Sequence, residues 1–226
     1  MKAGFFITGT DTGVGKTHVA LSLMQFLREE GLHVLGMKPV ASGVSPGDVG
    51  NRDALRLQGM SQVDVPYDWV NPFLYKDPVP PHLAARWTGM EISVEVLDRA
   101  LNRLFCLSDC VVVEGAGGWL VPLGAQFDMA DLAKHFNLPV ILVVGIRLGC
   151  INHARLSDLS IRQSAVPYAG WVANCLHQGY FPEKETISEL THYLGRDPLA
   201  RLSRGESDAK SNNPWNRDEI LRRLEP

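Results

Sequence analysis

The sequence lacks an excess of basic residues. Its 226 residues include 22 Lys and Arg against 25 Asp and Glu, so the formal net charge is −3. A protein that binds nucleic acid without sequence preference carries a basic surplus, so this balance argues against that class. Apolar residues make up 45% and charged residues 21% of the chain, which is ordinary globular usage and excludes a disordered or fibrous protein. One large domain is the simplest expectation for this length.

Long apolar runs and paired cysteines are also missing. No apolar run reaches the roughly 18–20 residues that span a bilayer. Asp11 and Lys16 interrupt the first apolar segment too early for a signal peptide. The four cysteines are Cys106, Cys110, Cys150 and Cys175. Because they form no CxxC pair and show no zinc spacing, we expect reduced thiols in a cytoplasmic protein. From the apolar runs and the charge balance we expect no membrane partner and no nucleic-acid partner.

The apolar spacing indicates strands that alternate with helices. An apolar run at 4–8 predicts a buried strand, and apolar residues three and four apart over 16–30 predict a helix with one buried face. A second strand at 33–37 completes a βαβ unit. Further strands are expected at 109–114, 138–145 and 168–174, and helices at 52–58, 93–105, 128–136, 150–164 and 182–194. Continuous apolar strands are typically covered on both faces, so we predict an α/β fold with a mostly parallel sheet and helices on both faces.

Three stretches are expected to lack regular structure. Residues 41–51 are rich in Ser, Gly and Pro and are interpreted as a loop. Residues 66–82 contain five prolines, which predicts an extended crossing segment without a regular helix. The chain becomes polar at residue 196. We therefore divide it into an α/β domain of residues 1–195 and a tail of the same domain, residues 196–226, which has little to bury and is expected to be poorly ordered.

The junction between the first strand and the first helix is rich in glycine. It has the sequence GTDTGVGKT from Gly9 to Thr17, and its end matches a P-loop, although the first glycine is displaced by one residue. Glycines let successive backbone N–H groups surround an anion, and a helix N-terminus adds partial positive charge. Lys16 is placed to reach the β and γ phosphates of a nucleotide, and the Thr17 hydroxyl to hold Mg²⁺. The motif makes the predicted α/β fold P-loop NTPase-like, and it predicts a nucleotide site but not a reaction.

Other candidate residues follow neighbouring strands. Ligands of parallel sheets bind beyond the carboxyl ends of the strands, so Lys38, which follows the second strand, is expected to share a rim with Lys16. A strongly anionic group would have to lie between two ammonium groups there; the alternative is a surface lysine at the sheet edge. Glu114 ends its strand at the position of a Mg²⁺-binding acid. Asp53 is either an acidic residue at a helix start or a second metal carboxylate.

Two loop segments give weaker candidates. Ser42 lies in a glycine-flanked loop and is either a substrate contact or a plain turn serine. Residues 148–153 follow a strand and open a helix. Their exposed N–H groups suit a carboxylate, although an ordinary strand-to-helix turn has the same pattern.

Taken together, these motifs resemble the dethiobiotin synthetase family. They occur in the family's order and cover residues 4 to about 176. The segments are GTDTGVGKT at 9–17, KPVASG at 38–43, EGAGG at 114–118, PVILVVG at 139–145, LGCINHA at 148–154 and GWVAN at 170–174. The resemblance implies a ligase of biotin biosynthesis that uses ATP and Mg²⁺ to convert 7,8-diaminononanoate and CO₂ into dethiobiotin. The implied path runs through a carbamate and a carbamic–phosphoric anhydride.

The resemblance also implies roles for individual residues. Lys16, Lys38 and Thr12 would be catalytic, and Thr17, Asp53 and Glu114 would bind Mg²⁺. The substrate-binding residues would be Ser42 and, from the second subunit of a homodimer, Gly149, Cys150, Ile151 and Asn152. The nucleotide-binding residues would be Gly13, Val14, Gly15, Lys16, Thr17, His18, Asp53, Glu114, Gly115, Ala116, Gly117 and Asn174, of which Asn174 would contact adenine.

Two positions depart from the family's pattern. Gly13 stands where some members carry Glu, and residues 198–204 lack the glycine and proline of a segment that helps to hold the base, so no base contact is assigned to them. An alternative from another class is a switch ATPase of the partitioning type. Such proteins carry a lysine early in the P-loop, where this chain has Thr10 and Asp11.

Overall fold

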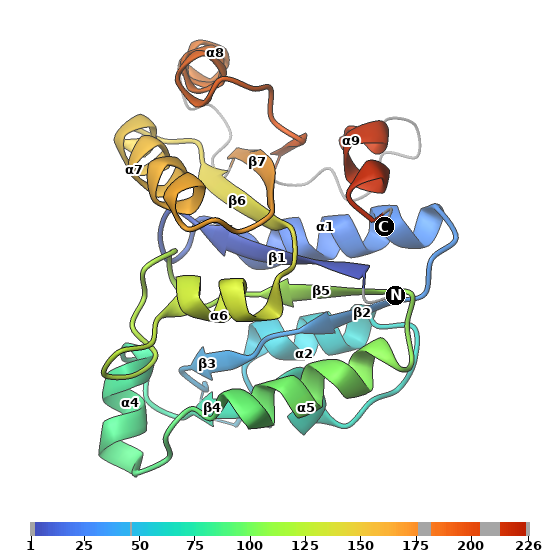
Figure 1. The fold of residues 1–226 in the computed structure, drawn as a ribbon, viewed down its shortest axis with the longest axis vertical. Coiled ribbons are helices and arrows are strands. Elements are labelled where there is room, and N and C mark those ends of the chain that lie inside the picture. Colours follow the sequence, from blue (N-terminus) through green and yellow to red (C-terminus); the bar gives the residue numbers. More distant parts are fainter. Residues whose placement is uncertain (1–2, 46, 176–181, 204–212, 225–226) are drawn as a thin grey trace.

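A single parallel sheet organises the chain. The computed structural model describes residues 3–45, 47–175, 182–203 and 213–224. Its six-stranded sheet has the order β2-β5-β1-β6-β7-β8, and every neighbouring pair is parallel (Figure 1). The strands are β1 (Ala3–Gly9), β2 (Val34–Met37), β5 (Cys110–Glu114), β6 (Val140–Gly145), β7 (Tyr168–Cys175) and β8 (Ala200–Ser203). All four carboxyl ends of β2, β5, β1 and β6 therefore meet at one edge of the sheet.

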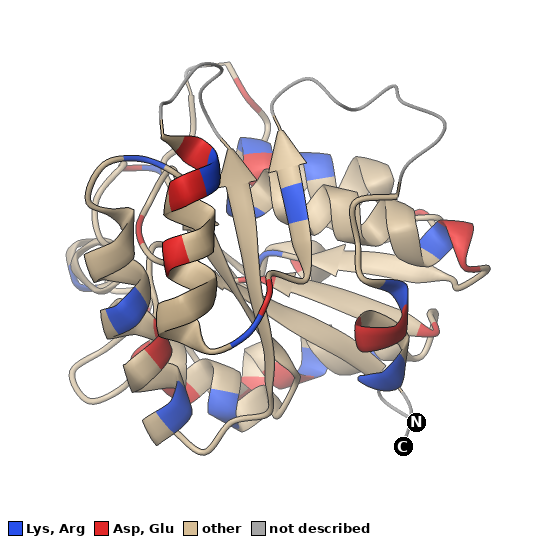
Figure 2. Cartoon of the chain, turned by 90° about the horizontal axis from the view of Figure 1, so that it is seen from above, with Lys and Arg blue, Asp and Glu red and all other residues tan. Residues whose placement is uncertain are grey.

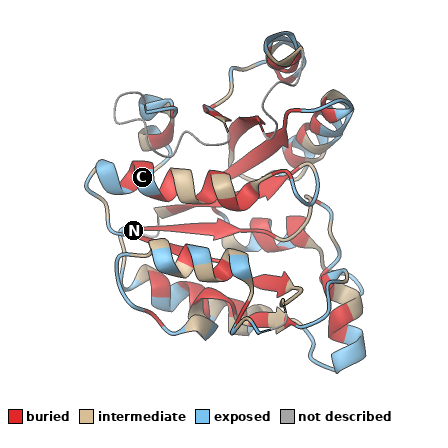
Figure 3. Cartoon of the chain, turned by 180° about the vertical axis from the view of Figure 1, so that it is seen from behind, coloured by how far each residue is buried: buried red, intermediate tan, exposed pale blue. Residues whose placement is uncertain are grey.

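Helices cover both faces of this sheet, which confirms the predicted α/β fold. The larger ones are α1 (Lys16–Glu29), α2 (Arg52–Met60), α5 (Val94–Phe105), α6 (Met129–Phe136), α7 (Cys150–Gln163) and α8 (Glu183–Leu194). Alternate residues of each strand enter different cores: Phe6 packs under α5 and α6, whereas Phe5 and Ile7 pack under α1. Figure 3 shows the strands mostly buried and the helices buried on the side that faces the sheet.

Charge follows the same division between surface and core. Figure 2 shows Lys and Arg interspersed with Asp and Glu over the helices, whereas the strands are mostly uncharged. A fully buried exception is Glu114 at the end of β5, which is 1% exposed. A buried carboxylate needs compensating partners, so its position marks a site. None of the described helices is both long and apolar enough to cross a membrane.

The predicted loop at 41–51 and the predicted extended segment at 66–82 are wrong in part. Short strands β3 (Val40–Ser42) and β4 (Phe73–Tyr75) pair in parallel, and helices α3 (Tyr67–Val70) and α4 (Pro81–Thr88) lie on either side of β4. Proline is tolerated before a helix and in its first turn, where the missing N–H has no partner to lose. Pro66 and Pro81 take these positions, and Pro72 precedes β4 instead of interrupting it.

The polar tail also buries more than its composition predicts. Strand β8 extends the sheet, and the short helix α9 (Arg217–Arg222) packs Ile220 into the core beside α1. Trp215 is 5% exposed, stacks on Phe26 at 6.3 Å between ring centroids, and donates from Nε1 to Ser22 Oγ at 3.0 Å. The expectation of a poorly ordered tail is therefore wrong for these residues, while 204–212 and 225–226 lie outside the described residues.

Trp215→Ala should lower the free energy of unfolding by about 3–5 kcal/mol, because a large buried ring is replaced by a cavity. Trp87→Ala is the matched control, since Trp87 is 63% exposed and its removal should stay within about 0.5 kcal/mol. Urea unfolding of both variants measures the difference. Equal stabilities would contradict the packing of the segment that contains Trp215 against α1.

Candidate active site

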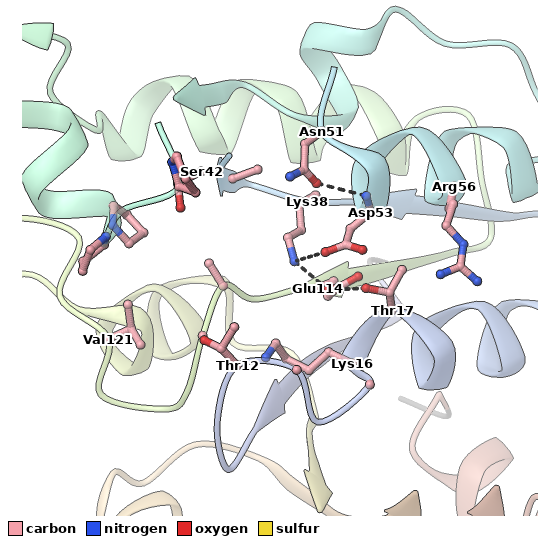
Figure 4. A pocket seen from close by; sticks show the side chains of 18 of the residues that line it. Thr12, Lys16, Thr17, Lys38, Ser42, Asn51, Asp53, Arg56, Glu114 and Val121 are labelled. Carbon is pink, nitrogen blue, oxygen red and sulfur yellow. Dashed lines mark hydrogen bonds and ion pairs between the residues drawn. The ribbon is translucent and has the colours of Figure 1, made fainter. Parts of the chain in front are cut away.

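A pocket of about 660 Å³ lies beyond the carboxyl ends of β1, β2 and β5, between the P-loop and the β3–β4 pair (Figure 4). Parallel strands bring residues far apart in sequence to this one edge. Twelve of the predicted residues line it: Thr12, Gly13, Gly15, Lys16, Thr17, His18, Lys38, Ser42, Asp53, Glu114, Ala116 and Gly117. The expectation that Lys16 and Lys38 share a rim is confirmed.

The P-loop has the backbone that its glycines predict. Gly13 and Gly15 have positive φ values of 76° and 88°, a conformation that strains other residues. Helix α1 begins at Lys16 without a side-chain cap, so its first N–H groups stay open to an anion. The Lys16 ammonium group donates to the carbonyl of Asp11 at 2.9 Å. This arrangement is an anion cradle at the start of a helix.

A charged centre surrounds Glu114. Its Oε1 accepts hydrogen bonds from Thr17 Oγ1 at 2.9 Å and from Lys38 Nζ at 2.6 Å. Lys38 Nζ also lies 3.3 Å from the carbonyl of Gly115 and 3.6 Å from Asp53 Oδ2. Lys38 is itself buried, at 5% exposure, so the pair with Glu114 is shielded from water. The β5 strand, the β2 end and the α2 start each deliver one of these charges (Figure 4).

Burial changes the acid–base behaviour of Lys16. Desolvation, which is the larger effect, and the nearby charge of Lys38 together lower the pKa of its ammonium group to about 8, although Glu114, Asp53 and Asp11 oppose the shift. Both effects disfavour a second positive charge beside Lys38 in this cradle. An anion bound between the two lysines would remove this penalty, so the pocket is built to take a strongly negative ligand.

The oxygen atoms of this centre fit a magnesium ion. Glu114 Oε2 is buried and has no hydrogen-bond partner among the described residues, which leaves a carboxylate oxygen available to a cation. No group of three or more His, Cys, Asp or Glu residues in the described ranges could hold a metal by itself. Mg²⁺ takes one or two carboxylates and completes its shell with water and substrate phosphates, so Glu114, Asp53 and the Thr17 hydroxyl suit it.

Some predicted residues lie outside the pocket lining. Asn174 is 1% exposed; its Nδ2 donates to the Val14 carbonyl at 2.8 Å and its Oδ1 lies 3.1 Å from His18 Nδ1. Its amide thus supports the back of the P-loop, next to Val14. The turn at 149–152 follows β6, with Gly149 at φ 89° before α7, and it does not line the pocket within one copy of the chain.

Sequence patterns missed a second part of the pocket. The additional lining residues are Ala41, Asn51, Arg56, Pro78, Val79, Pro80, Pro81 and Val121. Arg56 follows Asp53 by three residues on a predicted helix, so helical spacing alone could have placed both on one face. An apolar wall opposite the charged centre is formed by Pro78 to Pro81 and Val121. No sequence motif predicts this wall.

Several known proteins are similar to this chain in sequence. A family model described as an AAA domain matches residues 3–208. The ATP-dependent dethiobiotin synthetase BioD of Xylella fastidiosa (strain Temecula1 / ATCC 700964) is 47% identical over 192 residues, which cover 84% of this chain and 85% of that protein. The corresponding protein of Pseudomonas aeruginosa (strain UCBPP-PA14) is 44% identical over 205 residues, covering 89% and 90%.

The solved structures extend the likeness to a more distant protein. A ParA family ATPase from Chlorobium tepidum TLS matches with a TM-score of 0.55 and 17% identity, over 98% of this chain and 91% of that one. At this identity the match shows a common fold alone.

Proposed function

The chain belongs to the ATP-dependent dethiobiotin synthetase family, and we propose that its ring closure takes place in the pocket between the P-loop and the β3–β4 pair. It is an ATP-dependent ligase of biotin biosynthesis that uses Mg²⁺. The observation that carries the assignment of the site is the meeting of Lys16, Lys38 and Glu114 in one cavity. The switch ATPase is set aside, because the synthetases are 44–47% identical to this chain and the ParA family protein only 17%.

The proposed substrates are 7,8-diaminononanoate, CO₂ and ATP. One amine adds to CO₂ and loses a proton, which gives a carbamate. A carbamate oxygen attacks the γ-phosphorus of ATP and ADP leaves, which forms the carbamic–phosphoric anhydride. The second amine then attacks the carbonyl carbon and loses a proton, and phosphate departs with the electrons of the C–O bond as the cyclic urea closes. The apolar wall from Pro78 to Pro81 suits the hydrocarbon body of this diamine.

The two lysines are proposed to stabilise negative charge during phosphoryl transfer. Lys16 would hold the phosphates bound at the α1 N-terminus, and Lys38 would face the transferred group from the β2 side. Preorganised charges of this kind act strongly because both ammonium groups are buried, at 6% and 5% exposure. Thr12 and Ser42 would hold the diamine and its carbamate by hydrogen bonds, since both line the pocket.

Magnesium is proposed to bind to Thr17, Asp53 and Glu114. When bound it would neutralise charge on the phosphates. The partner-free Oε2 of Glu114 supports this assignment. The nucleotide phosphates would lie against the backbone from Gly13 to His18 and against 115–117, and we propose that Asn174 lies near the base, where it already supports the P-loop through Val14.

A homodimer is proposed to complete the diamine site. The turn at 149–152 lies outside the pocket of its own chain, so its N–H groups would bind the substrate carboxylate in the pocket of a second copy. Three leucines on and beside α7 support a contact there: Leu148, Leu156 and Leu159 are 89%, 60% and 55% exposed. Large apolar side chains exposed on one element are what an interface would cover.

Two further proposals concern the cellular setting and the division of the chain into domains. We propose a cytoplasmic setting, supported by the free thiols of Cys106, Cys110 and Cys150. We also propose that 1–195 and 196–226 are parts of one domain, supported by the pairing of β8 with β7 in the main sheet.

Mass spectrometry of the reaction mixture tests the function. With diaminononanoate, bicarbonate, Mg²⁺ and ATP, the product should have the mass of dethiobiotin, and phosphate release should require both the diamine and bicarbonate. Repeating the reaction with each nucleoside triphosphate measures base selectivity. Rapid ATP hydrolysis without the diamine, and no dethiobiotin with it, would instead support a switch ATPase.

A further inference from the structure

We propose that Tyr67 and Asn71 form a hydrogen-bonded bridge that positions Lys38 and Asp53 for the reaction. Neither residue of this Tyr67–Asn71 bridge lines the pocket, and both come from the proline-rich segment that follows α2. The inference rests on the proposed function, since it names residues that act through Lys38 and Asp53. Both are therefore positioning residues and not catalytic ones.

The first arm of the bridge holds the backbone of Lys38. Strand β2 is an edge strand, so the chain beyond Met37 has no ladder partner on that side. The segment around α3 supplies one: Lys38 N donates to the Val70 carbonyl at 2.7 Å, and Asn71 Nδ2 donates to the Lys38 carbonyl at 2.7 Å. The same Nδ2 donates to the Phe73 carbonyl at 3.2 Å, so both its protons are used. Asn71 is 2% exposed, and a buried amide of this kind holds its neighbours rigidly.

The second arm holds the start of α2, where Asp53 lies. The Tyr67 hydroxyl donates to Asn71 Oδ1 at 2.9 Å and accepts from the backbone N–H of Asn51 at 2.9 Å. Asn51 in turn caps α2, with its Oδ1 accepting from Asp53 N at 3.0 Å and from Ala54 N at 3.3 Å. The hydroxyl therefore joins the segment that fixes Lys38 to the cap that fixes Asp53.

The two arms meet again inside the pocket. Lys38 Nζ lies 3.6 Å from Asp53 Oδ2, so the side chains converge at the end of a closed path through Asn71, Tyr67 and Asn51. A shift of either backbone would change this distance and the distance to Glu114. Since misplacement by about 1 Å can cost about 100-fold in rate, a hydroxyl outside the pocket can control turnover.

The space around the hydroxyl is closed on the side of Gly50. A Cβ added to Gly50 would lie 2.7 Å from Tyr67 Cζ and from its hydroxyl oxygen. Glycine at this position therefore leaves room for the Tyr67 ring tip against the backbone that leads into Asn51. Burial raises the pKa of the Tyr67 hydroxyl above its usual value of 10, so the proton that reaches Asn71 stays in place at assay pH.

Tyr67→Phe tests the bridge, and Tyr75→Phe is its matched control. Tyr75 belongs to β4, and its hydroxyl donates to the carbonyl of Met90 at 2.7 Å, a residue that does not line the pocket. For Tyr67→Phe we expect kcat to fall by about tenfold or more and the Mg²⁺ concentration for half-maximal rate to rise several-fold, with KM for ATP within about twofold. Tyr75→Phe should leave all three values within about twofold of the parent, because a purely local hydrogen bond affects stability and not the active site.

Gly50→Ala provides a second test that keeps the hydroxyl. Its methyl group should push the Tyr67 ring aside and reproduce the loss of kcat and the higher Mg²⁺ requirement, whereas Gly59→Ala, where nothing lies within 4 Å of the new Cβ, should not. If Tyr67→Phe does not fold, the kcat and the Mg²⁺ requirement of Gly50→Ala test the bridge instead. Parental kcat and Mg²⁺ dependence in the folded variants, or equal losses in the two controls, would overturn the bridge. A parent enzyme that forms no dethiobiotin would instead overturn the proposed function.

Discussion

Replacing Lys38 by methionine should lower the rate of dethiobiotin formation by about 10²–10³-fold while leaving ATP affinity nearly unchanged. Methionine keeps most of the apolar stem of the side chain and removes only the ammonium group. That group lies on the β2 side of the pocket, away from the P-loop backbone that would carry the nucleotide. Single-turnover formation of product and calorimetric titration with a non-hydrolysable ATP analogue separate the two effects.

The buried pair of Lys38 and Glu114 requires a control for stability. Removing one partner of a buried ion pair leaves an uncompensated charge and costs about 3–5 kcal/mol. Arg162→Met creates a similar defect far from the pocket, since Arg162 Nε pairs at 2.6 Å with Asp158, which is 7% exposed. That variant should lose stability and keep its activity. A Lys38→Met enzyme within about threefold of the parent rate would contradict transition-state stabilisation by Lys38.

Local motifs explain why most of the charged centre could be predicted. The glycines, Lys16 and Thr17 lie within one strand–turn–helix unit, and their chemistry follows from that unit alone. Lys38 and Glu114 each follow an apolar strand, and the rule that parallel strands end at a common edge then places them together. The distance of 2.6 Å between them is a consequence of the order β2-β5-β1, which no local pattern contains.

The remaining wall of the pocket depends on contacts between distant segments. Strands β3 and β4 have three residues each, too few to show a period, and residues 40–42 pair with 73–75. Both strands pack against α4, a contact between distant segments, so the prolines that flank them mislead a composition-based prediction. The bridge through Tyr67 and Asn71 is hidden for the same reason, since the hydrogen bonds that tie it to Asn51 and to Lys38 join residues 16 and 33 positions apart.

The contacts of a single residue cannot be predicted where no helical or strand periodicity places it on a face. Trp215 lies in a polar stretch, and only the fold brings it against Phe26 on α1. Asn174 was identified by its motif, yet the direction of its amide toward Val14 depends on how closely β7 approaches the P-loop. In both cases the partner of the residue is set by tertiary packing, which no local pattern contains.

Glu114→Gln should raise the Mg²⁺ concentration for half-maximal rate by about tenfold or more and lower kcat by about 10²–10³-fold. The substitution preserves shape, so the amide oxygen can still accept from Thr17. Its NH₂ group, however, would take the place of Oε2, the buried oxygen without a partner, and would present protons where a cation needs lone pairs. It also removes the full negative charge that balances Lys38.

The Mg²⁺ dependence distinguishes this effect from a general loss of activity. Lys38→Met should change the rate with little change in Mg²⁺ dependence, whereas Glu114→Gln should change both. Asp98→Asn is the control for loss of a carboxylate, because Asp98 is half-exposed and pairs with His135 at 2.9 Å on the outer helices. This variant should match the parent in rate and in Mg²⁺ dependence.

Direct titration with Mn²⁺, followed by its electron paramagnetic resonance signal, measures metal binding without turnover. If Glu114→Gln bound Mn²⁺ and responded to Mg²⁺ as the parent does, Glu114 would not be a metal ligand, and the metal would have to be held by Thr17, Asp53 and the phosphates.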